Sequence, residues 1–362
     1  MMKLFCITIL LFFSLIFQAQ SQTDKVKAQK LYEEGLKLLD QSQFKEASVK
    51  ISEAKQADPK TVDESFVEGY IFYKRKEYDD AISAFDTDIK SGKAKPDAYK
   101  LLGNCYELKN NKPKAASVYK AGLKAFPKSG VLLMELGITE MFNKNYNKAI
   151  EYFERGIKAE PDFAPNYYWA AKLFNQTPEK VWVLMYGETF MNLERNTDRT
   201  IDMGILLYEA YKKAFTEKSD TAKHLALTRN WTNTKQKSGT LIKPKMKLSF
   251  DEVFTETMSG SKAQKEFNLG ILANYRNNFL TDWFNTEQNK QFPNQLFTYL
   301  KTIKDQGKFE LYNYWLFQEG DQPTMARWIG NNDVKFNEFL KWFSDNPLKV
   351  QKEDKLYRGQ YW

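Results

Sequence analysis

The chain has 362 residues, of which 42% are hydrophobic and 28% charged, so we expect a sizeable core and two or three domains. It contains one histidine, His224, and two cysteines, Cys6 and Cys105. Zinc sites and Ser-His-Asp or Cys-His catalysis draw on these side chains, so the composition argues against most metal-centre and nucleophile chemistry. We therefore predict a non-catalytic protein with no metal and no cofactor.

The first 20 residues have the layout of a secretory signal peptide. Lys3 supplies a positive charge, an apolar run extends from Leu4 to Phe17, and the small residues Ala19 and Ser21 follow. As a helix, this run spans about 21 Å, short of the ~30 Å hydrocarbon core of a bilayer. We therefore predict cleavage, export to the periplasm or the outside of a bacterial cell, and no transmembrane segment in the mature chain.

The two cysteines support the same interpretation. Cys6 precedes most of the apolar run, whereas a bacterial lipoprotein carries its acylated cysteine after that run, so lipidation is not expected. The mature chain then keeps Cys105 alone and cannot form an internal disulfide. We expect Cys105 to be a small buried hydrophobic side chain.

A period of 34 residues runs through residues 28–163. Each period holds a glycine, an alanine twelve residues later and a large residue four positions after the alanine. The glycines are Gly35, Gly69, Gly103 and Gly137, the alanines Ala47, Ala81, Ala115 and Ala149, and the large residues Ile51, Phe85, Tyr119 and Phe153. Prolines follow in three periods, at positions 59, 127 and 161. This pattern predicts antiparallel helix pairs that cross at small residues, with proline ending the second helix.

The pattern resembles the tetratricopeptide repeat family, with its small–Ala–aromatic–Pro motif on a 34-residue period. The second repeat departs from this motif at Asp88 and Lys93. A fifth first helix is indicated at residues 164–171, and a further helix at residues 180–195. The resemblance implies an all-α fold in which a superhelix of four repeats and a degenerate fifth occupies residues 21–198.

The resemblance also implies that ligands bind on a concave face, which the first helix of each repeat lines. Counted from each repeat glycine, this face holds the residues three before and one, four and five after it. The candidate peptide-binding residues are Tyr32, Phe66, Tyr70, Tyr73, Lys74, Lys100, Asn104, Met134, Met141, Tyr168 and Lys172, and Leu108 and Phe142 occupy equivalent positions. Such a surface suits a peptide with apolar anchors. We expect a scaffold that binds a peptide or a partner protein here, unless the chain's own C-terminal part covers the face.

Lys100 and Asn104 also resemble the start of a carboxylate clamp, in which a lysine and an asparagine hold a peptide's C-terminal carboxylate. The clamp needs a further asparagine and further cations in the next two repeats. The matching positions hold Glu135, Pro165 and Trp169, so a clamp is not expected.

Positive charge is concentrated in residues 223–247. This segment holds six lysines and one arginine and no acidic residue, and the rest of the mature chain is nearly neutral. The predicted basic patch consists of Lys235, Lys237, Lys243, Lys245 and Lys247. It is either a solvated loop or a binding surface for an acidic envelope component. Nucleic acid is not an expected partner, because no recognised binding motif is present.

Residues 199–362 contain no repeat and are predicted to form a helical, aromatic-rich C-terminal domain. Helices are indicated at residues 200–215, 249–258, 261–284, 293–304 and 333–343. Five tryptophans lie late in the chain, at positions 283, 315, 328, 342 and 362, and their spacing favours packing in a core. The alternative function is glycan or envelope-polymer binding by this domain, extended to hydrolysis by carboxylates such as Glu310, Glu319 and Asp321.

Overall fold

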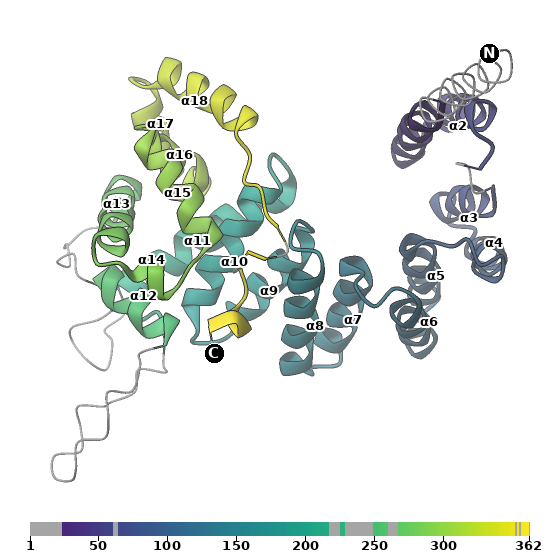
Figure 1. Cartoon of the computed structure of the whole chain (residues 1–362), viewed down its shortest axis with the longest axis horizontal. Coiled ribbons are helices and arrows are strands. Elements are labelled where there is room, and N and C mark those ends of the chain that lie inside the picture. The colour runs from purple at the N-terminus through teal and green to yellow at the C-terminus, as the bar shows by residue number, and fades with distance from the viewer. Residues whose placement is uncertain are drawn as a thin grey trace, which may run out of the picture. The chain divides into compact units, whose positions relative to one another are not determined.

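The computed structural model describes residues 24–60, 64–216, 225–228, 249–259, 267–351, 353–354 and 356–361, and their regular structure is helical (Figure 1). The predicted all-α fold is confirmed. The predicted signal peptide and the five lysines of the basic patch lie outside the described residues. Within the described ranges, no helix is long and apolar enough to cross a membrane.

The chain divides into two compact units, Met1–Pro127 and Lys128–Trp362. Residues 128–198, which the sequence places in the superhelix, therefore belong to the same unit as the C-terminal helices. The first unit contains a helix over residues 24–40, α2 (Phe44–Ala57), α3 (Glu64–Lys74), α4 (Tyr78–Lys90), α5 (Pro96–Leu108) and α6 (Lys112–Ala125).

The second unit begins with the fourth repeat and continues into the C-terminal helices. Its elements are α7 (Gly130–Phe142), α8 (Tyr146–Ala159), α9 (Pro165–Phe174), α10 (Lys180–Leu193), α11 (Asp198–Thr216), α12 (Phe250–Ser259), α13 (Leu269–Asn285), α14 (Gln288–Gln291), α15 (Gln295–Asp305), α16 (Phe309–Phe317), α17 (Gln322–Ile329), α18 (Asp333–Asp345) and the 3₁₀-helix η1 (Arg358–Tyr361). One hydrophobic core connects α8 with the C-terminal helices.

The repeat glycines lie where the two helices of each pair approach most closely. An ideal Cβ on Gly35, Gly69, Gly103 or Gly137 would lie 2.6, 2.8, 2.1 or 2.4 Å from the large side chain sixteen residues later. That side chain is Ile51, Phe85, Tyr119 or Phe153. The alanines at 47, 81, 115 and 149 are fully buried. Each large side chain therefore fills the space that a Cβ on the facing glycine would need.

The second helices end at two different signals. In α2, α6 and α8 the last helical residue precedes a proline by two positions, as proline cannot continue a helix. The second repeat has Lys93 in place of that proline, and α4 ends before Gly92, whose φ is +74°. Only glycine adopts this left-handed conformation without strain, so Gly92 ends the helix that the proline ends elsewhere.

Helix α10 is the centre of the second unit. Every residue from Val181 to Asn192 is buried, because α9, α11 and α12 pack around it. An ideal Cβ on Gly187 would lie 2.8 Å from the sulfur of Met203, which again is sixteen residues later. The close glycine contact thus continues between α10 and α11, beyond the point at which the sequence period is lost.

A buried ion pair and its hydrogen-bond partners join four helices of this core. Arg276 of α13 contacts Glu188 of α10 with Nη2–Oε1 at 2.5 Å and Nη1–Oε2 at 2.9 Å, and both side chains are less than a tenth exposed. The guanidinium also donates to Asn313 and Tyr211, and the Tyr312 hydroxyl donates to Glu188. A buried charge pair is tolerated only when its remaining donors and acceptors are satisfied, as they are here.

We expect Gly137→Ala to destabilise the second unit by about 1–3 kcal/mol, because the new methyl group would overlap the buried ring of Phe153. An ordinary Gly→Ala change in a helix has the opposite sign and stabilises by about 1 kcal/mol. Urea denaturation measures the difference. Gly330→Ala is the control, because the atom nearest its Cβ is 3.8 Å away. Equal stability of the two variants would contradict the packing described above.

We also expect the stability of the second unit to fall as pH rises from about 4 to 6. Burial, with Glu179 and Glu252 nearby, raises the pKa of Asp251 to about 6, although Trp182 and Arg358 act in the opposite direction. An unfolded chain releases this proton near pH 4, so the folded state holds it more strongly between the two values.

The variant Asp251→Asn removes the cost of ionising this carboxyl. It should be more stable than the natural chain by about 3 kcal/mol at pH 7, and the gap should shrink as pH falls towards 4. Thermal denaturation across this pH range measures the gap. A gap that is constant, or that grows as pH falls, would show that Asp251 is not the group responsible.

Candidate functional site

The candidate site is formed by the outward faces of the first helices of the repeats. In α5, for example, Leu101, Leu102 and Cys105 are buried on one side, whereas Lys100 and Asn104 are half-exposed on another. This division follows from the 3.6-residue period of an amphipathic helix. The helix 24–40, α3 and α5 carry the predicted residues of the first unit, and α7 and α9 carry those of the second.

Aromatic side chains cover α3. The rings of Phe66 and Tyr70 stack with centroids 6.1 Å apart, and the ring of Tyr73 lies 6.2 Å from that of Tyr78. All of them are half-buried against the core of the second repeat. Tyr32 differs, because it is 5% exposed and packs inside the core of the first repeat. Tyr32 therefore offers almost no surface to a ligand.

Asp40 connects the first helices of the first two repeats. The Tyr70 hydroxyl donates to the Asp40 carboxylate, and the Lys74 ammonium lies 3.0 Å from the Asp40 carbonyl oxygen and 3.5 Å from its carboxylate. Burial, together with this carboxylate, raises the pKa of Tyr70 well above its ordinary value. Tyr70 and Lys74 thus hold neighbouring helices together and set the geometry of the face.

The second unit repeats this arrangement at Asp202 of α11. The Tyr168 hydroxyl and the Lys172 ammonium each lie 2.8 Å from the same Asp202 oxygen. Burial alone would raise the pKa of Asp202, but these two hydrogen bonds leave it lowered. Burial and the bond to Asp202 raise the pKa of Tyr168 to about 12. α11 is therefore held against α9 by the same kind of contact that holds α3 against the helix 24–40.

The repeat pattern alone did not point to either aspartate, although the spacing of both offered a signal. Asp40 precedes Tyr70 and Lys74 by 30 and 34 residues, and Asp202 follows Lys172 and Tyr168 by 30 and 34 residues. A carboxylate at the repeat distance from a tyrosine–lysine pair on one helix face thus marks a contact between adjacent first helices.

The two residues that resembled a carboxylate clamp have partners within their own repeat. Lys100 lies 2.9 Å from Asp97, and Asn104 accepts a hydrogen bond of 2.6 Å from Tyr119. Glu135, at the next position that a clamp would use, is buried. Both side chains thus have partners within the repeat's own helices.

Large apolar side chains remain exposed at one repeat position, five residues after the glycine. Leu108 at the end of α5 is 55% exposed, and Phe142 at the end of α7 is 66% exposed. Met134 and Met141 of α7 are half-buried and pack against the core of the second unit. One first helix of each unit, α5 and α7, thus exposes a large apolar side chain at its end.

The C-terminal aromatic residues mainly build the core. Trp283 and Trp315 are buried, and Trp328 stacks on Tyr314 with ring centroids 3.8 Å apart. Trp362 lies outside the described residues. The buried rings of Trp283 and Trp315 cannot serve as stacking surfaces for a sugar.

The carboxylates considered for hydrolysis have structural partners. Asp321 accepts hydrogen bonds from the backbone N–H groups of Leu269 and Thr324 and from the Tyr208 hydroxyl, which leaves its pKa lowered despite burial. Glu310 accepts a bond from the indole of Trp328. No group of three or more metal-ligating side chains occurs in the part of the chain that the structure describes.

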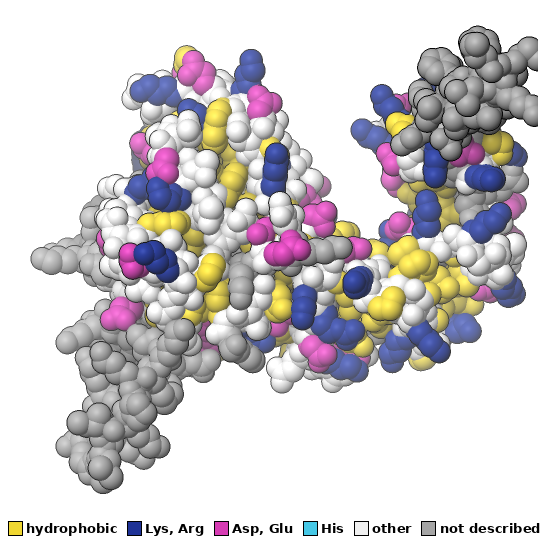
Figure 2. Space-filling view, viewed as in Figure 1, with side chains coloured by type: hydrophobic (Ala, Val, Ile, Leu, Met, Phe, Trp, Pro, Cys, Tyr) yellow, Lys and Arg dark blue, Asp and Glu magenta, His cyan; other side chains and the backbone are white. Residues whose placement is uncertain are grey.

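On the face shown in Figure 2, lysine and arginine side chains are interspersed with acidic ones.

Three comparisons relate this geometry to known proteins. A family model described as the tetratricopeptide repeat matches residues 66–130. Over 129 residues, the chain is 25% identical to the Hsp70-Hsp90 organizing protein 2 of Arabidopsis thaliana. The alignment covers 36% of this chain and 22% of that relative, so the chain spans about a fifth of the length of the curated relative it matches.

Three solved structures resemble parts of the chain. PilF of Pseudomonas aeruginosa is 18% identical, with 52% of this chain and 86% of that chain covered and a TM-score of 0.40. PilW, described as a type IV pilus biogenesis factor, is 17% identical, with 52% and 87% covered and a TM-score of 0.39. MamA is 17% identical, with 41% and 79% covered and a TM-score of 0.34. The family match identifies the helix pairs within residues 66–130 as tetratricopeptide repeats, and the glycine contacts at Gly35 and Gly137 show the same packing on either side of them.

Proposed function

We propose that this chain is a non-catalytic scaffold that binds a peptide or a partner protein on the faces of its first helices. The observation that carries the proposal is the exposure of Leu108 and Phe142 at one repeat position. A partner that covers such side chains gains roughly 25 cal/mol for each Å² of apolar surface removed from water. Anchors of this kind supply most of the affinity in protein interfaces.

The polar contacts support the same proposal. Asp40 and Asp202 hold adjacent first helices in place through tyrosine and lysine side chains. A face that is fixed before binding loses little conformational freedom when a ligand arrives, so more of the contact energy appears as affinity. Tyr73, half-buried beside this network, adds an aromatic contact surface.

The curated relative supports a role in bringing proteins together, because its name describes the organisation of two other proteins. The match covers only about a fifth of that relative, so its own partners are not transferred. We propose that this scaffold acts outside the cytoplasm, because residues 1–20 have the layout of a signal peptide.

Export predicts a shorter mature protein. The full coding sequence, expressed in a bacterium, should give a periplasmic or secreted protein whose intact mass lacks about the first 20 residues. A cytoplasmic protein that keeps these residues would contradict the proposed location and leave the proposed binding role intact.

Binding predicts a specific loss of affinity on the first-helix faces. Peptides selected on the purified protein from a random library should be rich in apolar residues. The double variant Leu108→Asp/Phe142→Asp should bind these peptides at least tenfold more weakly. Each new carboxylate would be buried against apolar side chains of the peptide without a partner for its charge. Isothermal titration calorimetry measures the affinity.

The matched control is Val49→Asp/Val334→Asp. Both valines are more than half exposed, one in each unit, on helices that are not first helices of a repeat. This variant should bind within twofold of the natural chain. Equal affinities of the two double variants would place the peptide elsewhere and remove the basis of the proposal.

A further inference from the structure

The chain end folds back onto the second unit. After α18, the described residues 346–351, 353–354 and 356–357 have no helix, and the 3₁₀-helix η1 then lies against the repeat helices (Figure 1). Leu356, just before η1, is 3% exposed. The last described residues are thus packed far more closely than a free chain end.

Arg358 fills a polar subsite. Its Nε lies 3.2 Å from Oε1 of Glu154 in α8, and its guanidinium lies over the ring of Phe174 at 5.1 Å. Its backbone N–H donates to the hydroxyl of Tyr186 in α10 at 3.0 Å, and that hydroxyl donates to Glu154 at 2.7 Å. A carboxylate beside an aromatic face is a favourable environment for an arginine.

Tyr361, three residues later, fills an aromatic subsite. Its ring stacks on Phe250 with centroids 4.4 Å apart and an interplanar angle of 12°. Its hydroxyl accepts a hydrogen bond of 2.8 Å from Asn294 and lies 3.1 Å from the carbonyl oxygen of Pro293. The stacked, half-buried ring and its satisfied hydroxyl together give this subsite a preference for tyrosine.

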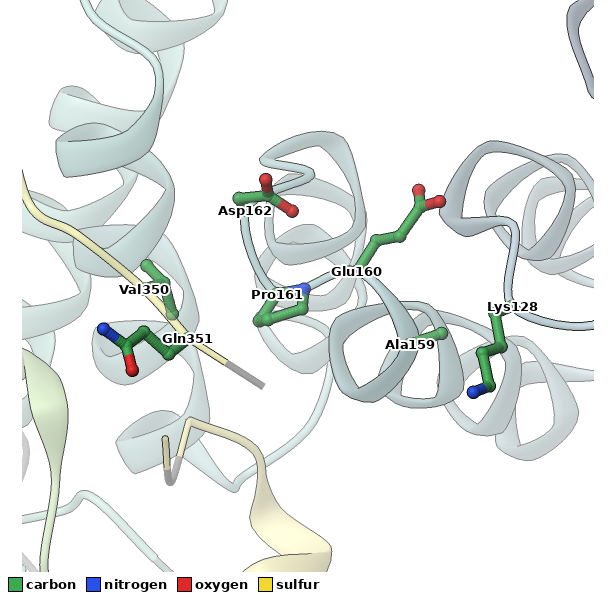
Figure 3. A pocket seen from close by; sticks show the side chains of 7 residues that line it. All are labelled: Lys128, Ala159, Glu160, Pro161, Asp162, Val350 and Gln351. Atoms are coloured by element: carbon green, nitrogen blue, oxygen red, sulfur yellow. The ribbon is translucent and has the colours of Figure 1, made fainter. Parts of the chain in front are cut away.

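Part of the segment that leads to these subsites borders open space. A cavity of about 260 Å³ lies beside it, with Val350 and Gln351 on one side and Pro161 and Asp162 of the α8–α9 loop opposite (Figure 3). Gln351 is exposed. The recess that holds Arg358 and Tyr361 is thus filled by a nearby segment of the same chain, which acts as a covalently attached ligand at a high effective concentration.

We propose that the recess formed by Glu154, Tyr186, Phe250 and Asn294 is a second peptide-binding site. Arg358 and Tyr361 of the chain's own C-terminus keep it filled. A partner segment with an arginine followed three residues later by a tyrosine takes their place. This site is separate from the first-helix faces, so its failure would leave the function proposed above unaffected.

The test empties the recess in the full-length chain. The variant Arg358→Ala/Tyr361→Ala is titrated with a fluorescent, amidated peptide that has the sequence of residues 356–361. We expect it to bind this peptide at least tenfold more tightly than the natural chain, whose own C-terminus competes at a high effective concentration. A peptide with both positions changed to alanine should not bind. Equal binding of the first peptide to both proteins, or no binding to a folded variant, overturns the proposal.

A second substitution tests the arginine subsite. Adding Glu154→Gln to the emptied variant should weaken peptide binding about tenfold, because the carboxylate that faces the arginine is lost. Glu151→Gln is the matched control on the same helix, where the side chain is largely exposed, and should leave the affinity unchanged. An equal effect of the two substitutions would contradict the assigned subsite.

Hydrogen exchange on the natural chain decides the question if the emptied variant does not fold. The backbone amides of residues 357–361 should exchange at least a hundredfold faster than those of α10. The reason is that these residues can detach from the recess while the core around α10 stays folded. Exchange at the same rate as α10 would make the end a permanent part of the core and overturn the proposal. A concentration-dependent dimer that requires Arg358 and Tyr361 would instead identify a second copy as the occupant, which also overturns it.

Discussion

The contact between a glycine and the large side chain sixteen residues later is the constraint on which this structure depends. Glycine has no Cβ, so a phenylalanine, tyrosine or isoleucine of the second helix occupies the space that a Cβ would need. The two helix axes can therefore approach closely. Each such contact fixes one helix pair. Within each unit, the first helices then lie next to one another, and they carry the faces that we propose for binding.

The sequence was informative where this contact recurs at a constant spacing. The positions of Gly35 to Gly137, with their alanines and prolines, were enough to predict the helix pairs and the family. The helix predicted at residues 249–258 is also confirmed as α12, and Ser249 and Glu252 exchange hydrogen bonds at its start. These features depend on local geometry, which a sequence pattern records directly.

Other parts could not be predicted because their determinants are not local. α16 is buried on almost every side, so its sequence has no polar stripe from which a helical period could be read. Arg276 and Glu188 are 88 residues apart, and neither is distinguishable from a surface charge before the core brings them together. In the candidate site, the groove positions followed from the repeat period, whereas the aspartates that hold them lie on neighbouring helices.

The two units differ in how their cores are connected. In the first, buried residues form separate clusters around neighbouring repeats. In the second, one core links α8 with α18, and α10 is enclosed by helices that come from distant parts of the chain. A duplication or loss of one repeat would therefore leave the first unit with intact neighbours, whereas the same event in the second would open its core. Evolution can change the length of this protein at its N-terminal half far more easily than at its C-terminal half.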